Sequence, residues 1–304
     1  MKHLINYVYK KSFFEGWYFK CQKGDQIISF IPSYSTDKNG ISRVFLQIIM
    51  NDNSYIIPYK PEDFYLNRKY LFIRIGNNSF SRKGIKIDIH TEKITINGIL
   101  YFGKMEPLPY TIMGYFHYFP GMECKHEIIS MYHKIKGSLK YNKREYNFNS
   151  GSGYLEKDMG HSFPKSYTWI QCNHFPAEKC SVFISIAEIP YHGIHFKGCI
   201  CAIHYKGKEY RFATYLGVKV LKSTCNEICL KQGKYLFKVK LYNNKRKNTK
   251  YNPEFSHKLA APVLGDMSKT IKEQHLIAGE FLLYEKSNLI LHLTSRHVSF
   301  EFVE

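Results

Sequence analysis

Long apolar runs are missing from this sequence. No uncharged apolar stretch approaches 18 residues, which argues against a membrane-spanning helix. The first 20 residues contain no apolar core of a secretory signal. We therefore expect a cytoplasmic protein whose eight cysteines are free thiols in the core. Cys225 and Cys229 have no matching pair elsewhere, so the sequence predicts no metal site.

Two common catalytic signatures are also missing. No Gly-x-Ser-x-Gly motif is present, so nothing indicates a nucleophilic serine of the hydrolase type. Gly151 and Gly153 are followed by Glu156, where a dinucleotide-binding loop requires a third glycine. The sequence therefore predicts no cofactor.

Acidic residues are scarce: 25 stand against 44 basic residues, for a formal net charge of +19. The lysines are scattered, and the one dense cluster is Lys245, Arg246 and Lys247 with Lys250. This distribution favours a solvated basic surface over a nucleic-acid interface, so we expect no nucleic-acid partner. The alternative is peripheral contact with an anionic membrane surface, where a hydrophobic substrate would reside.

Aromatic residues are abundant, at 16% of the chain, with 25 Tyr and 22 Phe. They favour strands and also line pockets for apolar ligands. Apolar and polar residues alternate over residues 13–20, 85–89, 236–241 and 289–293, with Asn-, Asp- and Gly-rich turns between such runs. Long amphipathic helix patterns are absent. The patterning predicts an all-β protein of the sandwich or barrel class.

The order of these runs suggests a duplication. Residues 17–21 and 27–32 are echoed by 169–172 and 182–186. Residues 78–84 and 96–100 are echoed by 226–233 and 277–281, and an insertion at about 243–275 would explain the larger last offset. We expect two antiparallel β-barrel or sandwich domains, residues 1–155 and 156–304, each of ordinary domain size.

Glu15 is the first candidate for chemistry. Alternation places it on one strand face with Phe13, Trp17 and Phe19. A carboxyl group among aromatic side chains is costly to ionise, so it could hold a proton near neutrality. The alternative is an ion pair with a lysine or arginine across the barrel.

His126 and a pair of carboxylates complete the candidates. His126 shares a strand face with Cys124 and Ile128 and could orient a ligand or relay protons, although a lone strand histidine is more often structural. Glu156 and Asp158 project to one face of a predicted strand, close enough to share a proton. The alternative for both carboxylates is surface charge.

Three motifs together resemble the tocopherol cyclase family. They are Glu-Gly-Trp-Tyr-Phe-Lys at 15–20, Glu-Cys-Lys-His-Glu at 123–127, and residues 153–164 leading into Thr-Trp-Ile-Gln-Cys-Asn at 168–173. Further matches at 187–190, 212–215 and 261–267 occur in the same order, so the resemblance covers most of the chain. One departure is Met159, where a tryptophan would be expected after the aspartate.

The resemblance implies two lipocalin-like β-barrel domains with a site near their junction. It also implies protonation of an alkene in an isoprenoid chain, such as that of a prenylated quinol, followed by capture of the cation by a hydroxyl or water. This chemistry requires a protonated acid in a dry pocket beside aromatic faces. The predicted acids are Asp158, Glu156 and Glu15, with His126 in support.

We expect the pocket for this hydrophobic small molecule to be lined by Trp17, Tyr18, Tyr154, Trp169, Gln171 and Asn173. The alternative function is a non-catalytic lipocalin-like carrier of a hydrophobic or aromatic molecule. A carrier pocket can be apolar throughout, whereas an enzyme must place an acid against the alkene.

Overall fold

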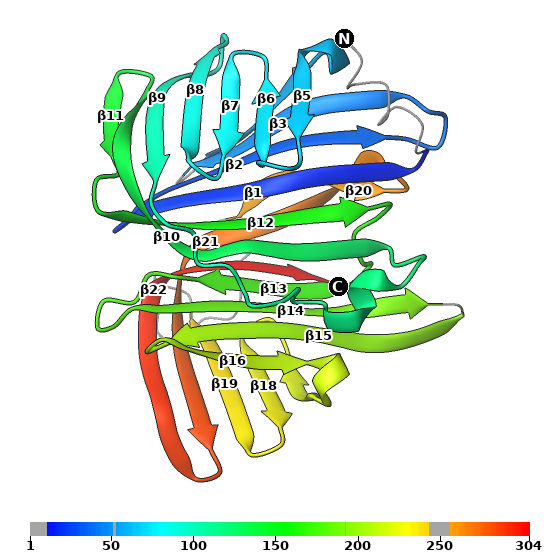
Figure 1. Cartoon of the computed structure of the whole chain (residues 1–304), viewed down its shortest axis with the longest axis vertical. Helices are drawn as coiled ribbons and strands as arrows, with labels where there is room; N and C mark the ends of the chain where they lie inside the picture. Colours follow the sequence, from blue (N-terminus) through cyan, green and yellow to red (C-terminus); the bar gives the residue numbers. More distant parts are fainter. Residues whose placement is uncertain (1–10, 51–52, 192, 243–255) are drawn as a thin grey trace. The chain divides into compact units, whose positions relative to one another are not determined.

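The computed structural model of the chain describes residues 11–50, 53–191, 193–242 and 256–304. Antiparallel strands account for most of them, and within these ranges the helical elements are three short 3-10 turns (Figure 1). The predicted all-β class is confirmed. Among the described residues, no helix is long and apolar enough to cross a membrane.

Twelve strands of the described chain form the first sheet. They are β1 (Phe13–Lys23), β2 (Gln26–Thr36), β3 (Ser42–Met50), β4 (Asn53–Tyr59), β5 (Phe64–Asn67), β6 (Phe72–Ile75), β7 (Asn78–Ser81), β8 (Gly84–His90), β9 (Thr95–Phe102), β10 (Cys124–Tyr141), β11 (Arg144–Asn147) and β12 (Gly151–Gly160). Turn η1 (Pro61–Asp63) precedes β5, and turn η2 (Gly114–Tyr118) precedes β10.

Ten described strands form the second sheet. They are β13 (Tyr167–Cys172), β14 (Cys180–Tyr191), β15 (Ile194–Tyr205), β16 (Lys208–Ala213), β17 (Lys219–Ser223), β18 (Glu227–Gln232), β19 (Tyr235–Tyr242), β20 (His257–Val263), β21 (Asp266–Glu285) and β22 (Asn288–Val303). Turn η3 (Thr214–Leu216) follows β16.

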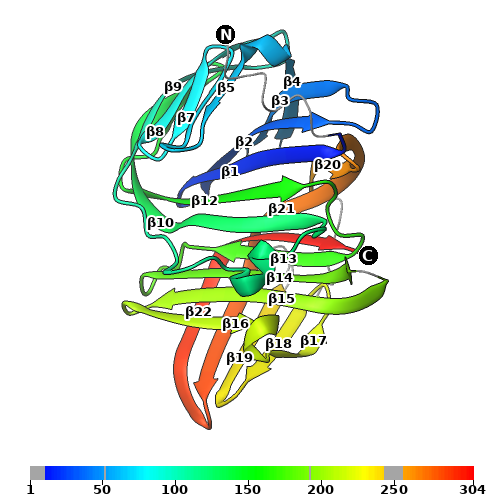
Figure 2. The ribbon, with the colours of Figure 1, turned by 45° about the vertical axis from the view of Figure 1, so that its right-hand side comes forward.

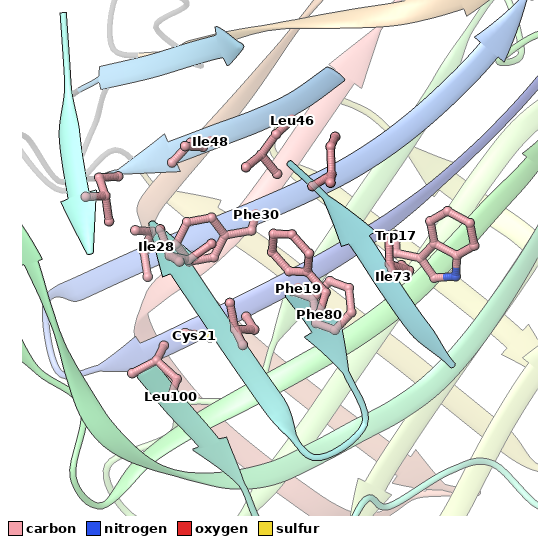
Figure 3. Close-up of a cluster of buried hydrophobic side chains, with 14 of the residues drawn as sticks. Trp17, Phe19, Cys21, Ile28, Phe30, Leu46, Ile48, Ile73, Phe80 and Leu100 are labelled. Atoms are coloured by element: carbon pink, nitrogen blue, oxygen red, sulfur yellow. The ribbon is translucent and has the colours of Figure 1, made fainter. Parts of the chain in front are cut away.

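The first sheet curls over its own core. Its hydrogen-bonded order is β4-β3-β2-β1-β12-β10-β9-β8-β7-β6-β5. Side chains from distant strands of this order nevertheless meet, since Phe30 of β2 lies 6.0 Å from Phe80 of β7 between ring centroids, and Phe19 of β1 lies 5.4 Å from the same ring (Figure 3). Alternation supplies the packing surface, as in β8, where Ile85, Ile87 and Ile89 are buried. The sheet is therefore barrel-like.

The second sheet follows the same plan in the order β16-β15-β14-β13-β22-β21-β19-β18-β17. Its two ends also meet, because Phe212 of β16 stacks on Phe237 of β19 at 5.9 Å. The side chain of Gln232 in β18 bonds the backbone of Arg211 and Ala213 around the end of β16. Two antiparallel, barrel-like sheets of the predicted lipocalin-like kind are thus confirmed (Figure 2).

The shared strand order bears on the proposed duplication. In each sheet the first strand pairs with the second and with the last, as β1 does with β2 and β12, and β13 with β14 and β22. The first two sequence echoes therefore occupy equivalent strands. The last two are displaced by one strand: residues 96–100 lie in β9, whereas 277–281 lie in β21, the counterpart of β10. The short alternating segments are too alike to fix their register from sequence.

The chain divides into two compact units, and each consists of separate stretches. Unit 1 comprises Met1–Leu108, Ile128–Ser162 and Ala260–Lys269, and unit 2 comprises Pro109–Glu127, Phe163–Leu259 and Thr270–Glu304. This division differs from the predicted boundary at residue 155 in three ways, the first being that residues 109–127 belong to unit 2. Strand β12 completes the first sheet as far as Gly160, and residues 260–269 join unit 1, where Gln47 exchanges two hydrogen bonds with the backbone of Ala260.

All eight cysteines are free thiols, as expected, and five of them are buried. Burial raises the pKa of the Cys21 and Cys201 thiols, which suits inert core positions. The basic cluster at 245–250 and the first part of the predicted insertion at 243–275, residues 243–255, lie outside the described residues.

Candidate active site

The two faces of strands β1 and β12 carry different chemistry. One face contributes Trp17, Phe19 and Leu155 to the barrel core of unit 1. The opposite face, called the polar face below, carries mainly hydroxyl, amine and carboxyl groups. It consists of Tyr18 and Lys20 of β1, Ser29 of β2, and Tyr154, Glu156 and Asp158 of β12.

Strand register brings the polar face together. Tyr18 lies directly opposite Glu156, Lys20 opposite Tyr154, and Gly16 opposite Asp158. Directly opposed residues of an antiparallel pair have neighbouring side chains, so residues about 140 positions apart in the sequence become neighbours. Glu156 and Asp158 share a face of β12, as alternation predicts, and the register adds Tyr18 and Tyr154 to the same face.

Glu156 is the most enclosed of the predicted acids on this face, at 4% exposure. The fully buried hydroxyl of Tyr154 donates to Glu156 Oε2 across 2.5 Å. Burial and the adjacent Glu156 carboxylate raise the pKa of Tyr154 well above 10, so the phenol keeps its proton. Tyr154 is therefore a fixed donor to the Glu156 carboxyl group.

The other members support this arrangement. Ser29 Oγ donates to the Tyr18 hydroxyl across 3.0 Å, which fixes the ring opposite Glu156. Lys20 is 1% exposed, so the face holds a buried basic group as well as an acidic one. Asp158 is half-buried, two residues along β12 from Glu156. Gly16 lies opposite Asp158, and a Cβ at position 16 would approach Ser33 Oγ to 2.7 Å, so the Ser33 hydroxyl would have to rotate away.

Glu15 lies on the core face of β1 rather than on the polar face. Arg68 donates to both of its carboxylate oxygens, and Tyr34 donates to Oε2 across 2.9 Å. Lys157 Nζ lies 3.9 Å from Oε1. A bidentate guanidinium and a second cation suit an ionised carboxylate. This is the ion pair that the sequence left as the alternative to a protonated acid.

Trp17 and Met159 also point away from the polar face. Trp17 is 1% exposed and belongs to the same core cluster as Phe19 and Ile73 (Figure 3). Met159 pairs with Glu15 on the core side of β12. The expectation that Trp17 lines one pocket with Tyr18 and Tyr154 requires correction, because neighbouring strand residues face opposite sides of a sheet.

His126 lies in unit 2, where its ring stacks on Phe183 with centroids 4.7 Å apart and planes at 13°. Its backbone N–H donates to the sulfur of Met113 across 3.1 Å. His126 is 9% exposed. Its ring is therefore held by stacking, and its predicted part in proton transfer stays a prediction.

His133, the second histidine of the same motif, lies in the interior of unit 1. Burial lowers its pKa from 6.5 to about 3, so the ring is neutral. The ring packs 4.4 Å from Phe102, and Nδ1 lies 3.2 Å from Ser130 Oγ. Gly153 is required beside it, since a Cβ there would lie 2.2 Å from Nε2.

Unit 2 has a comparable non-core face. Ile170 and Cys172 of β13 enter its core, so Trp169, Gln171 and Asn173 project from the opposite side, all buried. Trp169 lies opposite Glu301 of β22, and Gln171 lies opposite Ser299. The hydroxyl of Tyr167 donates to Glu301 Oε2 across 2.6 Å, a carboxyl–phenol pair like that of Tyr154 and Glu156. The predicted pocket near the junction of the halves stays a prediction.

Sequence reasoning missed a polar cluster on this face of unit 2. Glu273 Oε1 lies 3.1 Å from His275 Nε2, and Ser299 Oγ lies 2.9 Å from His275 Nδ1. All three side chains are buried, and Glu273 pairs with Glu301 across the β21–β22 ladder. The pattern Glu-Gln-His at 273–275 was the available signal. The duplication pattern places this segment in an insertion at about 243–275, although alternation puts Glu273 and His275 on one strand face.

The fold and these faces define an all-β protein of two barrel-like antiparallel sheets, each with buried carboxyl and phenol groups outside its apolar core. A solved structure with this architecture is that of CghA, at a TM-score of 0.58 and 10% identity, covering 96% of this chain and 88% of that chain. This likeness concerns the fold.

The sequence comparisons point to one family. Residues 81–223 match the family described as Tocopherol cyclase-like, which confirms the resemblance seen in the motifs. The chloroplastic tocopherol cyclase of Zea mays is 22% identical over 268 residues, covering 68% of this chain and 56% of that protein. A probable tocopherol cyclase of Oryza sativa subsp. japonica is 23% identical, with 68% and 57% covered. The chain thus spans little more than half the length of these relatives.

Proposed function

We propose that this protein is an enzyme that cyclises or hydrates an isoprenoid-type substrate, such as a prenylated quinol, by acid catalysis without a cofactor. The observation that carries the proposal is the buried Tyr154–Glu156 pair on a face that also holds Tyr18 and Asp158. The match to the Tocopherol cyclase-like family supports the reaction class. The crystal structure of CghA with Sch210972, at a TM-score of 0.57, supports ligand binding by this fold.

Glu156 is the proposed acid. Its carboxyl group transfers a proton to the alkene carbon, which leaves a carboxylate on Glu156 and a tertiary cation on the substrate. A substrate hydroxyl, or water, adds to the cation and returns a proton to Glu156, so the protein ends unchanged. Tyr154, which keeps its proton, stabilises the Glu156 carboxylate while it exists.

The remaining residues of the polar face assist this step. Asp158, two residues from Glu156 on the same face of β12, places a second carboxyl group beside the proposed acid. The ring of Tyr18, directly opposite Glu156, offers an aromatic face to the developing cation. Glu15 has a structural role in this proposal, because Arg68 and Lys157 hold it in an ion pair.

The test compares Glu156→Gln with the wild type on a prenylated hydroquinone whose side chain contains the alkene. Turnover in D2O should place a deuterium on the protonated carbon, which mass spectrometry of the product detects. Glu156→Gln should lose turnover and keep ligand binding measured by calorimetry. Glu145→Gln, at an exposed position of the same unit, is the matched control and should be fully active.

Two outcomes would count against the proposal. Full turnover by Glu156→Gln would remove Glu156 from the acid role. Tight binding of the hydroquinone by the wild type with no product and no deuterium incorporation would favour the carrier function instead. Native mass spectrometry of freshly purified protein would then identify the cargo.

A further inference from the structure

A surface of unit 2 gathers exposed aromatic and aliphatic side chains from three elements. Turn η2 contributes Tyr115 and Tyr118, the β14–β15 hairpin contributes Ile194, and turn η3 contributes Leu216. Tyr118 is 78% exposed and Ile194 is 67% exposed, so most of the surface of both side chains faces solvent. We call these four residues, with Phe116 and Phe119 beneath them, the aromatic patch.

Ring contacts make the aromatic patch continuous. Phe119 lies 5.7 Å from Tyr191, which pairs with Ile194 at the hairpin end. Phe116 lies 6.0 Å from Phe196 of β15, and Tyr115 lies 5.7 Å from Tyr215 of η3. Apolar side chains that cluster on a surface, rather than occurring singly, mark an interaction site.

The aromatic patch is held rigidly in place. Arg211 of β16 donates to the backbone oxygens of Tyr110 and Thr111, and its guanidinium lies 3.7 Å from the Tyr110 ring. The hydroxyl of Tyr215 donates to Ile112 O across 2.9 Å. The Arg211 side chain is nearly buried and makes five contacts. They fix the chain immediately before η2.

Basic side chains adjoin the aromatic patch. Strand β17 follows η3, and its Lys219 lies directly opposite Lys231 of β18. Both lysines are exposed, and among the described residues neither forms an ion pair. Two positive charges directly opposite each other on paired strands repel and destabilise the pair. An anionic surface would relieve the repulsion, and the chain carries a net charge of +19.

We propose that the aromatic patch, with Lys219 and Lys231 at its edge, docks unit 2 on an anionic lipid bilayer. Tyrosine suits this role because its ring enters the interfacial region while its hydroxyl stays hydrated. Ile194 and Leu216 add apolar area, and the two lysines contact lipid headgroups. The choice of a membrane rests partly on the proposed function, since an isoprenoid substrate partitions into bilayers.

Flotation with vesicles tests the docking surface. Vesicles of phosphatidylcholine alone are compared with vesicles that also contain phosphatidylserine, at low and high salt. The wild type should bind the phosphatidylserine vesicles, and the binding should weaken with salt because headgroup attraction is screened. Tyr118→Ser/Ile194→Ser should reduce binding about tenfold or more, and Lys219→Gln/Lys231→Gln should reduce it selectively on anionic vesicles.

The matched control is Tyr70→Ser/Leu289→Ser, which removes two similarly exposed apolar side chains outside the aromatic patch and should bind like the wild type. Equal binding by Tyr118→Ser/Ile194→Ser and the wild type would overturn the proposal. Equal binding of the wild type to vesicles with and without phosphatidylserine would also overturn it. So would sedimentation data that show a dimer formed through the aromatic patch, if the protein binds no vesicles. Circular dichroism confirms that each variant is folded.

A further measurement separates this proposal from the catalytic one. With substrate dispersed in detergent, Tyr118→Ser/Ile194→Ser should turn over like the wild type. With substrate embedded in phosphatidylserine vesicles, the same variant should be slower. Vesicle binding without any turnover would retain the docking surface and reject the enzyme, whereas equal rates in both assays would reject the docking surface alone.

Discussion

Arg68 donates to both carboxylate oxygens of Glu15. Glu15 is fully buried, while the Arg68 side chain is 39% exposed. Arg68 lies in the turn between β5 and β6, and its side chain reaches Glu15 on the core face of β1. The pair therefore ties β1 to the turn between β5 and β6.

Arg68→Met should destabilise the protein by about 2–4 kcal/mol, because it leaves a buried carboxylate without its main cation. Urea unfolding followed by fluorescence measures the change. Glu15→Gln/Arg68→Met should cost less than the sum of the single variants, and strict additivity would show that the pair contributes no coupling. Arg82→Met, at an exposed turn, is the control.

Tyr154→Phe should lower turnover about ten- to a hundredfold without a change in ligand affinity. The lost hydroxyl stabilises the Glu156 carboxylate that forms during protonation, and a hydrogen bond to a charged group contributes about 1.5–3 kcal/mol. Steady-state kinetics and calorimetry separate the two effects. An unchanged kcat would contradict this role. Tyr101→Phe, at an exposed tyrosine, should behave like the wild type.

Acid should destabilise unit 1 through His133. Its folded pKa of about 3 lies below the unfolded value of about 6.5, so the unfolded chain binds the proton first. The contribution of neutral His133 to the free energy of unfolding is complete above about pH 6.5 and is lost as the pH falls toward 3. Between pH 7 and pH 5 the wild type should therefore lose about 2 kcal/mol relative to His133→Gln.

Urea titrations at the two pH values measure the His133 effect. His90→Gln replaces an exposed histidine and should show the same acid sensitivity as the wild type. Parallel losses in the wild type and His133→Gln would mean that the folded and unfolded chains bind the His133 proton equally across this interval, which would contradict the lowered folded pKa.

Gly153→Ala should destabilise unit 1 by about 1–3 kcal/mol, because the new methyl group overlaps the His133 ring. His133→Ala opens that space, so the two substitutions together should cost less than their sum. Thermal unfolding of the four proteins gives the coupling. Gly24→Ala is the control: it has no atom within 4 Å, and its left-handed φ of +55° sets the strain expected without a clash.

Strand alternation was sufficient to predict much of this protein. It placed Glu156 and Asp158 on one face and gave the all-β class, because each depends on residues two apart. It also places Trp17 and Tyr18 on opposite faces of β1, so the expectation that both line one pocket departs from the alternation itself. The partner of Glu15 was equally inaccessible, since Arg68 reaches it across the barrel, 53 positions along the chain. Glu273 and His275 fall within residues 243–275, which the duplication pattern interprets as an insertion, so their shared strand face is not predicted.

The pairing of β1 with β12 also has a consequence for synthesis on the ribosome. Strand β1 emerges first and joins β2 at once, yet its other edge waits until Gly151–Gly160 has been translated. In the second sheet, β13 waits likewise for Asn288–Val303. An apolar strand with an open edge invites pairing with other nascent chains. We therefore expect the closing of each sheet by its last strand to be a slow step of folding, and chaperones that shield β1 and β13 to raise the yield.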